Sequence, residues 1–245
     1  MAGWQPLDIE AHYVSADGGA VSTTLGAVDS LRLVPGLPVR DIPSHAVQRH
    51  YPGLFWSATT RGHVWYESLL ELDRLWLADL DPEVEWIASQ PVWLVGLDGT
   101  TRRRHVPDLF LRSAQGGYTL VDVKPEKFAA KPEVAAVFDW TGRLCAAKGW
   151  RYEVWSEGPA TLLANVRFLA AGRRRELIDD DAVNAVETAA AAGMTIDEVS
   201  TAVASLICRS LVRPAILSLL WSGRWATDLS IPFSGASVIS RVEAP

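Results

Sequence analysis

The sequence predicts a mixed α/β (α+β) fold, in which a mixed sheet flanked by helices is followed by a helical C-terminal part. The first supporting observation is that residues 63–155 alternate between apolar segments with helical spacing and short apolar runs separated by Gly and Pro. The second is that helical patterns alone follow Gly158 as far as residue 221. With 245 residues, the chain can form one large domain or two small ones.

The elements of the sheet region follow one another closely. Residues 63–80 carry Leu and Trp at helical spacing and predict an amphipathic helix, which Asp81-Pro82 ends. Strands are predicted over four short segments, namely 83–88, 92–97, 101–112 and 118–124. Two hairpin turns are predicted between them, at Asp98-Gly99 and Gly116-Gly117.

A helix is predicted over 131–149, where Gly149 is suited to be the C-terminal stop, and a strand over 151–155. This last strand can pair in parallel with an inner strand, because a helix provides the crossover.

The two ends of the chain differ from this middle region. Residues 1–60 are rich in Gly, Pro and Ser and predict a partly irregular arm with short strands at most. Beyond Gly158, Thr195 and Glu198 form a capping-box signature, and Pro214 is placed in the first turn of a helix. Four helices are predicted there, over 162–170, 180–192, 196–206 and 211–221. Short extended pieces follow, so the outline is that of a winged-helix-like domain over 171–245 after a main domain over 61–170.

Composition limits the class of protein. The formal net charge of −6 counts against a strong autonomous DNA binder, although a metal nuclease needs an acidic site of its own. The Arg-rich stretches at 102–104 and 173–175 are either local basic patches or solvated loop charges. Cys145 and Cys208 are too few and too far apart for a disulfide framework or a zinc site. No apolar run is long enough to span a membrane and the first residues lack a secretory pattern, so a cytoplasmic location is expected.

Charged residues interrupt the apolar strands in an unusual way. Asp108 follows Val-Pro in one strand, and Asp122 and Lys124 end the next, across the Gly-Gly turn. A half-buried strand disfavours charge unless the charge is paired or binds a metal, so the pattern indicates a divalent metal with an ammonium beside it. On their own, an Asp-x-Lys at a strand end and an Asp after Pro are also ordinary solvated or turn residues.

Glu67 and Glu71 are predicted on the first helix, four residues apart and therefore on one face. If that helix packs beside the strands, Glu67 can approach Asp108 and Asp122, and three carboxylates would then need a cation such as Mg²⁺ or Mn²⁺. A metal-activated water, deprotonated with help from Lys124, could attack a phosphodiester. Considered without the motifs of the strands, the same two Glu residues indicate only an ordinary solvated helix face.

The order of these motifs resembles that of the PD-(D/E)xK restriction-endonuclease-like superfamily, since HVPDLFL and YTLVDVKP follow a helix that carries Glu67-Ser68. Within that superfamily the chain looks like TnsA-type endonuclease subunits of heteromeric transposases. The segments that carry this second resemblance are YPGLFWSATTRGHVWYESLLELDRLWLADLDPEVEWIASQP, RRRHVPDLFL, VDVKP and GWRYEVWSE. The resemblance covers roughly residues 48–170, and the C-terminal part is similar in outline to the winged-helix-like domain of those subunits.

The resemblance implies a restriction-endonuclease-like core and a Mg²⁺- or Mn²⁺-dependent DNA endonuclease, working in a bacterial cytoplasm at the nucleoid. Such a subunit cuts the 5′ ends of a mobile element, while a DDE-type transposase cuts and joins the 3′ ends and an AAA+ ATPase regulates both. Double-stranded DNA of the transposon ends would be the substrate. The resemblance makes Glu67, Asp108 and Asp122 the metal ligands and Lys124 the basic residue of the motif, although some members have Gln where this chain has Asp122.

Two further residues match the pattern, and two alternative functions stay open. Gln90 fits the Gln-Pro of these subunits, either as support for the site or as a turn residue, and His105 is either a phosphate contact or a satisfied strand histidine. The first alternative is a stand-alone restriction or repair nuclease of the same fold. The second is a non-catalytic DNA-binding or scaffolding subunit that uses residues of the C-terminal part, namely Arg209, Arg213, Arg224, Trp221 and Trp225.

Overall fold

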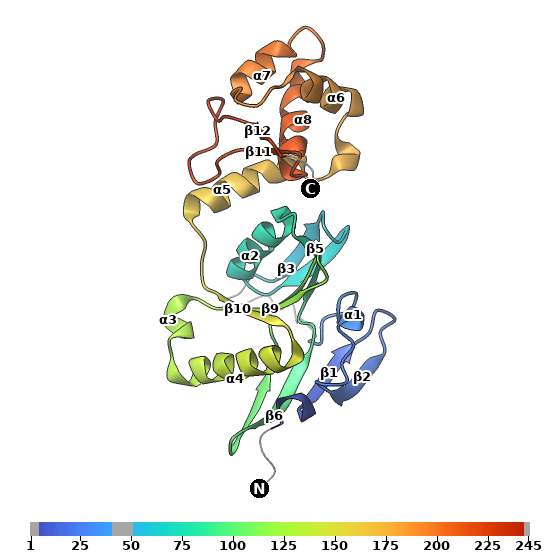
Figure 1. The fold of residues 1–245 in the computed structure, drawn as a ribbon, viewed down its shortest axis with the longest axis vertical. Coiled ribbons are helices and arrows are strands. Elements are labelled where there is room, and N and C mark those ends of the chain that lie inside the picture. The colour runs from blue at the N-terminus through green and yellow to red at the C-terminus, as the bar shows by residue number, and fades with distance from the viewer. Residues whose placement is uncertain (1–4, 41–50, 243–245) are drawn as a thin grey trace. The chain divides into compact units, whose positions relative to one another are not determined.

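The computed structural model describes residues 5–40 and 51–242 of the chain (Figure 1). Strands and helices alternate through much of it, so the prediction of a mixed α/β protein is confirmed. The chain divides into two compact units, residues 1–157 and 158–245. No helix among the described residues combines the length and the apolar character needed to cross a membrane.

Two four-stranded sheets and a hairpin build the first unit (Figure 1). One sheet has the order β2 (Ala20–Thr24), β1 (Glu10–Val14), β6 (Trp93–Asp98) and β7 (Thr101–His105). The other has the order β10 (Arg151–Trp155), β9 (Tyr118–Val123), β8 (Leu109–Ser113) and β5 (Val84–Ser89). The hairpin joins β3 (Gly53–Ser57) to β4 (Gly62–Tyr66). The helical segments of this unit are η1 (Pro6–Asp8), α1 (Ser30–Leu33), α2 (Leu69–Leu80), α3 (Glu126–Ala129) and α4 (Pro132–Lys148).

The sheet that contains β9 is buried on both faces. Leu120 of β9 belongs to an apolar cluster with Trp140 and Leu144 of α4. Its neighbour Val121 points to the opposite face and belongs to a cluster with Leu75 of α2. The alternation along β9 therefore places one helix on each side of the sheet and fixes which side chains face α4.

The predicted parallel crossover is confirmed, because β10 pairs in parallel with β9 after the helix α4. Gly149 ends α4 in the left-handed conformation, with φ of 77°, which a residue without Cβ adopts readily. The Asp98-Gly99 hairpin is also confirmed, since β6 and β7 pair directly across it.

The helix predicted over 63–80 begins at Leu69, and this prediction was wrong for its first turns. Residues 62–66 form β4 instead, paired with β3. Ser68 is the N-cap of α2, and its hydroxyl accepts a hydrogen bond from the N–H of Glu71. Glu67 therefore precedes the helix, and the expectation that Glu67 and Glu71 share a helical face is corrected.

The single strand predicted over 101–112 is two strands. It breaks at residues 106–108, where Pro107 has no N–H to offer a sheet ladder. The piece before the break, β7, pairs with β6, whereas the piece after it, β8, pairs with β5 and β9. Asp108 consequently lies in the link between two sheets rather than inside one strand.

The second unit is mostly helical and ends in a two-stranded sheet. Its longer helices are α5 (Ala160–Leu169), α6 (Asp180–Ala189), α7 (Ile196–Ala202) and α8 (Arg209–Trp221). Its short elements are η2 (Ala170–Gly172), η3 (Arg175–Leu177), β11 (Trp225–Ala226) and β12 (Ser240–Arg241). The Thr195–Glu198 capping box is confirmed.

The predicted position of Pro214 was wrong. Because α8 begins at Arg209, Pro214 lies inside the helix and not in its first turn.

The two Trp residues of this unit are core residues. Trp221 is 7% exposed and Trp225 is 2% exposed, so neither ring is available for stacking on a base at the surface. Arg209 and Arg213 lie on exposed positions of α8, and Arg224 forms an ion pair with Glu187.

We expect Gly172→Ala to destabilise the second unit. A Cβ at this position would lie 2.3 Å from the carbonyl carbon of Leu217 and 2.4 Å from the nitrogen of Ser218. Since these atoms are backbone of α8, η2 and α8 must move apart, which costs on the order of 1–3 kcal/mol. Thermal unfolding of the full chain measures the loss. Gly117→Ala is the matched control, because its nearest neighbour would be the Ser113 hydroxyl at 3.6 Å. Equal stability of the two variants would contradict the close packing of η2 on α8.

Candidate active site

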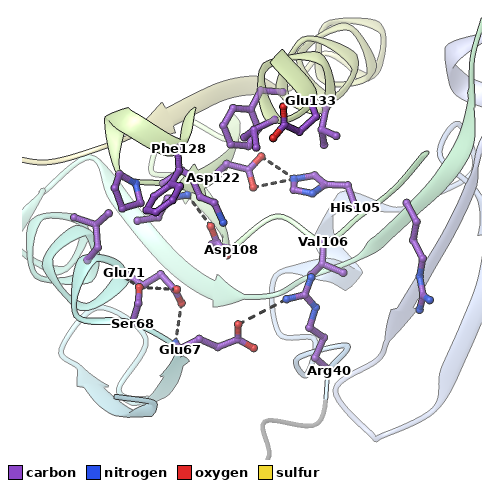
Figure 2. A pocket seen from close by; sticks show the side chains of 18 of the residues that line it. Arg40, Glu67, Ser68, Glu71, His105, Val106, Asp108, Asp122, Phe128 and Glu133 are labelled. Atoms are coloured by element: carbon purple, nitrogen blue, oxygen red, sulfur yellow. Dashed lines mark hydrogen bonds and ion pairs between the residues drawn. The ribbon is translucent and has the colours of Figure 1, made fainter. Parts of the chain in front are cut away.

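A cavity of about 870 Å³ opens on the first unit, between the start of α2, the β7–β8 link, the end of β9 and the helix α4 (Figure 2). The predicted site residues that line it are Glu67, Glu71, His105, Asp108, Asp122 and Lys124. Gln90 is 2% exposed and reaches the same place through a hydrogen bond to Glu67. Residues that lie far apart in the sequence are therefore gathered around one cavity.

Hydrogen bonds from both the backbone and the side chain of Asp108 fix its position next to β9. Its N–H donates to the carbonyl of Val121 at 3.0 Å, and its carbonyl accepts from the N–H of Gln90 at 2.8 Å. The side-chain oxygen Oδ2 accepts from the N–H of Val123 at 2.6 Å. Its other oxygen, Oδ1, has no hydrogen-bond partner within residues 5–40 and 51–242. One oxygen thus anchors the carboxyl group and the other is available for a ligand.

The negative form of Asp108 is disfavoured in this place. Burial is the main reason that the pKa of Asp108 lies well above its ordinary value, and the carboxylates of Glu71 and Asp122 raise this pKa further. The Val123 hydrogen bond and the charge of Lys124 act in the opposite direction. A cation bound at this point would relieve the repulsion among these acids.

Glu71 is the acidic residue of the first turn of α2, and it is buried, with 8% exposure. Its Oε2 accepts from the N–H of Glu67 at 2.8 Å, and its Oε1 accepts from the hydroxyl of Ser68 at 2.8 Å. The N–H of Glu71 in turn donates to the Ser68 hydroxyl at 3.2 Å, which is the N-cap hydrogen bond of α2. Burial raises the pKa of Glu71, and the charge of Glu67 adds to the increase, while Lys124 lowers it.

The side chain of Glu67 extends toward Arg40 (Figure 2). Its Oε1 accepts from Nε2 of Gln90 at 2.7 Å, and its Oε2 lies 3.7 Å from Nη1 of Arg40. Gln90 has a φ of 46°, in the left-handed region that favours Gly, and its backbone N–H is bonded to Asp108. Gln90 therefore contacts Glu67 through its side chain and Asp108 through its backbone N–H. We interpret it as a residue that supports the site rather than one that binds a ligand.

Asp122 is 2% exposed and faces α4 rather than the start of α2. Its Oδ1 and Oδ2 lie 2.9 and 2.8 Å from Nε2 of His105, and the hydroxyl of Tyr152 donates to Oδ2 at 2.5 Å. Burial and then the Asp122 charge raise the pKa of Tyr152 far above its ordinary value, and they raise the pKa of Cys145 to about 12. His105 is thus a partner of a buried carboxylate in this structure.

Lys124 places a positive charge near the carboxyl groups of Asp108 and Glu71. Its side chain is exposed, and within the described part of the chain its ammonium forms no ion pair with a carboxylate. It nevertheless lies near enough to lower the pKa of both Asp108 and Glu71. The ammonium is therefore available to a negatively charged ligand in the cavity.

The three predicted metal ligands are not arranged as a ready chelating set. Across residues 5–40 and 51–242, no group of three or more His, Cys, Asp and Glu side chains could hold a metal ion as it stands. The physical reason is that Glu67 and Asp122 are hydrogen-bonded to neighbours in other directions. Asp108 keeps one oxygen without a hydrogen-bond partner among the described residues. Glu71, whose oxygens accept from the Glu67 N–H and the Ser68 hydroxyl, is the other buried acid of raised pKa. Such a pair fits Mg²⁺, which is often bound by one or two carboxylates and completes its shell with water and phosphate.

Comparison with protein-family models and with curated proteins finds no match to this chain. The class of protein consequently rests on the cavity and on the order of the motifs.

Two contributors to the site were not predicted from the sequence. Arg40 enters the cavity from the N-terminal region, and Tyr152 reaches Asp122 from β10. Parallel pairing of β9 with β10 places Leu120 opposite Tyr152, so the alternation of β10 was a usable signal for Tyr152. Arg40 follows an irregular segment without periodicity, and nothing in its local sequence marks it.

We expect Asp108→Asn to raise the melting temperature at neutral pH when EDTA removes divalent cations. A carboxyl group whose folded pKa is raised destabilises the folded state once it ionises, so the wild type loses stability as the pH rises from the ordinary pKa of 3.8 through the raised value. Asn keeps an oxygen for the Val123 N–H but carries no charge. Below the ordinary pKa, the two proteins should melt alike. Thermal melting across this pH range measures the difference, and a stability gain that is the same at every pH would contradict the assignment.

Proposed function

We propose that this chain is a metal-dependent DNA endonuclease subunit of a heteromeric transposase, which hydrolyses phosphodiester bonds at the 5′ ends of a mobile element. The observation that carries the proposal is the pairing of Asp108 and Glu71, two acids of raised pKa, with the ammonium of Lys124 on one cavity wall. The motif order ES, QP, HVPD and DVK, which resembles that of TnsA-type subunits, supports the same class.

The proposed chemistry assigns a task to each residue. A bound Mg²⁺ or Mn²⁺ would supply Lewis-acid chemistry, which makes water a better nucleophile and neutralises charge on phosphate. Asp108 and Glu71 would hold the cation, and Lys124 would donate a hydrogen bond to a non-bridging phosphate oxygen, where negative charge develops. His105 and Tyr152 fix Asp122 and, through it, the end of β9 that carries Lys124.

The fold has a corresponding interpretation. The sheet β10-β9-β8-β5 between α2 and α4 would be a restriction-endonuclease-like core, and the second unit a winged-helix-like domain that contacts the transposition regulator. A chain with a net charge of −6 has little capacity to attract DNA by itself. Dependence on a DDE-type transposase and an AAA+ ATPase, which would deliver the transposon ends, is consistent with that charge.

The test of this function is strand-specific cleavage of a duplex that carries an element end. We expect cleavage of the 5′ strand in Mg²⁺ only when the co-encoded transposase and ATPase are present. Absence of cleavage with all partners present, or strong cleavage of arbitrary duplex by the isolated chain, would contradict the proposal. Cleavage of a specific duplex by the chain alone would favour a stand-alone restriction or repair nuclease.

One observation favours a second candidate, a non-catalytic DNA-binding or scaffolding subunit. Glu67 and Asp122 are engaged with Gln90, Arg40, His105 and Tyr152, so a three-ligand metal site would require these side chains to turn. A folded chain that binds neither Mg²⁺ nor Mn²⁺ would establish this candidate over the nuclease.

We expect Glu71→Gln to weaken divalent-cation binding more than Glu67→Gln does. The charge of Glu71 raises the pKa of Asp108, whereas the carboxylate of Glu67 is bound to Gln90 and Arg40. Both replacements keep the size of the side chain, and the amide oxygen introduced by Glu71→Gln can still accept the hydrogen bond from the Glu67 N–H. Calorimetric titration with Mn²⁺ compares the two variants. A larger loss of Mn²⁺ affinity in Glu67→Gln than in Glu71→Gln would support Glu67 as the metal ligand that the motif predicts.

A further inference from the structure

Two guanidinium groups that line the cavity contact the ring of Trp93 on β6. The Cζ of Arg104 lies 3.6 Å from the ring centroid, and the Cζ of Arg40 lies 5.1 Å from it. Both arginines line the cavity, together with Lys124. The aromatic face holds each guanidinium by cation–π attraction and leaves its N–H groups accessible.

The local backbone explains why these arginines meet at one ring. Indole Nε1 of Trp93 donates to the carbonyl of Val39 at 3.3 Å, and the N–H of Val39 donates to the carbonyl of Gln90 at 3.0 Å. The residue before Arg40 is thus tied to the segment that joins β5 to β6. Arg104 comes from the neighbouring strand β7, paired with Val95 of β6. These contacts place the backbone from which both arginine side chains reach the ring of Trp93.

The charges of the two arginines are incompletely neutralised. Within the described residues, Arg104 forms no ion pair with a carboxylate, and Arg40 has one long contact of 3.7 Å to the half-buried Glu67. The adjacent Arg103, by contrast, points to the other face of β7 and pairs with Asp98 at 2.7 Å. Unpaired, planar guanidinium groups present a fork of N–H donors that matches the oxygens of phosphate.

We propose that Arg40 and Arg104, held on Trp93, bind the phosphodiester backbone of the nucleic-acid strand beside the phosphate that faces Lys124. The inference rests on the proposed nuclease function, because the arginines share the cavity with Asp108. A polyanion that approaches the carboxylates of this cavity is repelled, and two cations next to them offset that repulsion. The pair would therefore determine how the backbone enters the site and would add affinity without sequence preference.

The test is binding of a short fluorescein-labelled DNA duplex to the full chain by anisotropy, at low salt and in EDTA so that no cleavage occurs. We expect Arg104→Ala to weaken binding on the order of tenfold and to reduce the slope of log K against log salt by about one. Arg40→Ala should act in the same direction. Arg104→Lys should retain part of the affinity, since it keeps the charge but loses the planar stack.

Arg102→Ala is the matched control, because Arg102 is exposed on the same strand and face but does not line the cavity. Equal affinities of the Arg104, Arg40 and Arg102 variants would overturn the phosphate site, as would a wild type that binds no duplex at low salt. Melting temperatures show whether each variant is folded.

The two proposals fail in different ways. If wild type cleaves, Asp108→Asn does not, and Arg104→Ala binds like the control, the phosphate site is wrong and the nuclease stands. If Arg104→Ala loses binding but no metal or partner elicits cleavage from the wild type, the phosphate site stands and the nuclease is wrong.

Discussion

Asp108→Asn is expected to reduce cleavage of the 5′ strand on the order of a thousandfold or more. Oδ1 of Asp108 has no hydrogen-bond partner among the described residues, and burial, followed by the charges of Glu71 and Asp122, raises the pKa of this carboxyl group well above its ordinary value. Asn offers a neutral oxygen, which binds a hard cation far less well than a carboxylate. Single-turnover cleavage of an element-end duplex, with the partners present, measures the loss.

The matched control is Asp139→Asn, on an exposed position of α4 outside the cavity. It removes the same charge and should cleave like the wild type. Because the amide oxygen introduced by Asp108→Asn can still accept the Val123 N–H, the first variant should remain folded, and its circular dichroism and melting curve check this. A folded Asp108→Asn protein that cleaves at the wild-type rate would remove Asp108 from the active site.

Lys124→Ala is expected to slow cleavage on the order of a hundredfold or more. The ammonium has no ion-pair partner among the described residues and lies near both Asp108 and Glu71, so in the proposed reaction it would stabilise charge that develops on the phosphate. Lys124→Arg should recover only part of the rate, since a planar guanidinium does not reproduce a compact ammonium. The single-turnover assay used for Asp108 also measures this effect.

Lys127→Ala serves as the control for Lys124. Lys127 and Phe128 are neighbours on α3, and the Lys127 ammonium lies 5.0 Å from the centroid of the Phe128 ring. Lys127 does not line the cavity. We expect this variant to retain the wild-type rate, because it removes a similar charge a few residues away. Equal rates for the two alanine variants would show that Lys124 contributes only general charge.

Much of the fold was predictable from the sequence because its signals are local. Gly149 ends α4, Asp98-Gly99 turns β6 into β7, and Thr195 caps α7, each through atoms within a few residues. The errors arose where two local signals compete. Residues 63–67 extend the apolar pattern of α2, but Ser68 accepts the Glu71 N–H and starts the helix after Glu67. Pro107 likewise divides the predicted strand 101–112 into strands of two sheets.

The candidate site was predictable only as a set of residues. The motif order placed Asp108, Asp122 and Lys124 around one cavity, and the structure gathers them there. The directions of the side chains depend on partners from distant segments, such as Tyr152 for Asp122 and Gln90 for Glu67. No spacing rule contains that information. Glu71 was predicted only to share a helical face with Glu67, whereas its charge raises the pKa of Asp108.

The most direct measurement is calorimetric titration of the full chain with Mn²⁺, in two buffers of different ionisation enthalpy. If Asp108 and Glu71 hold a divalent cation, the wild type and Asp139→Asn should bind Mn²⁺ and release protons, because carboxyl groups of raised pKa must ionise to become ligands. Asp108→Asn should lose most of this binding. A wild type that binds no Mn²⁺, or an Asp108→Asn protein that binds it equally well, would contradict the metal site.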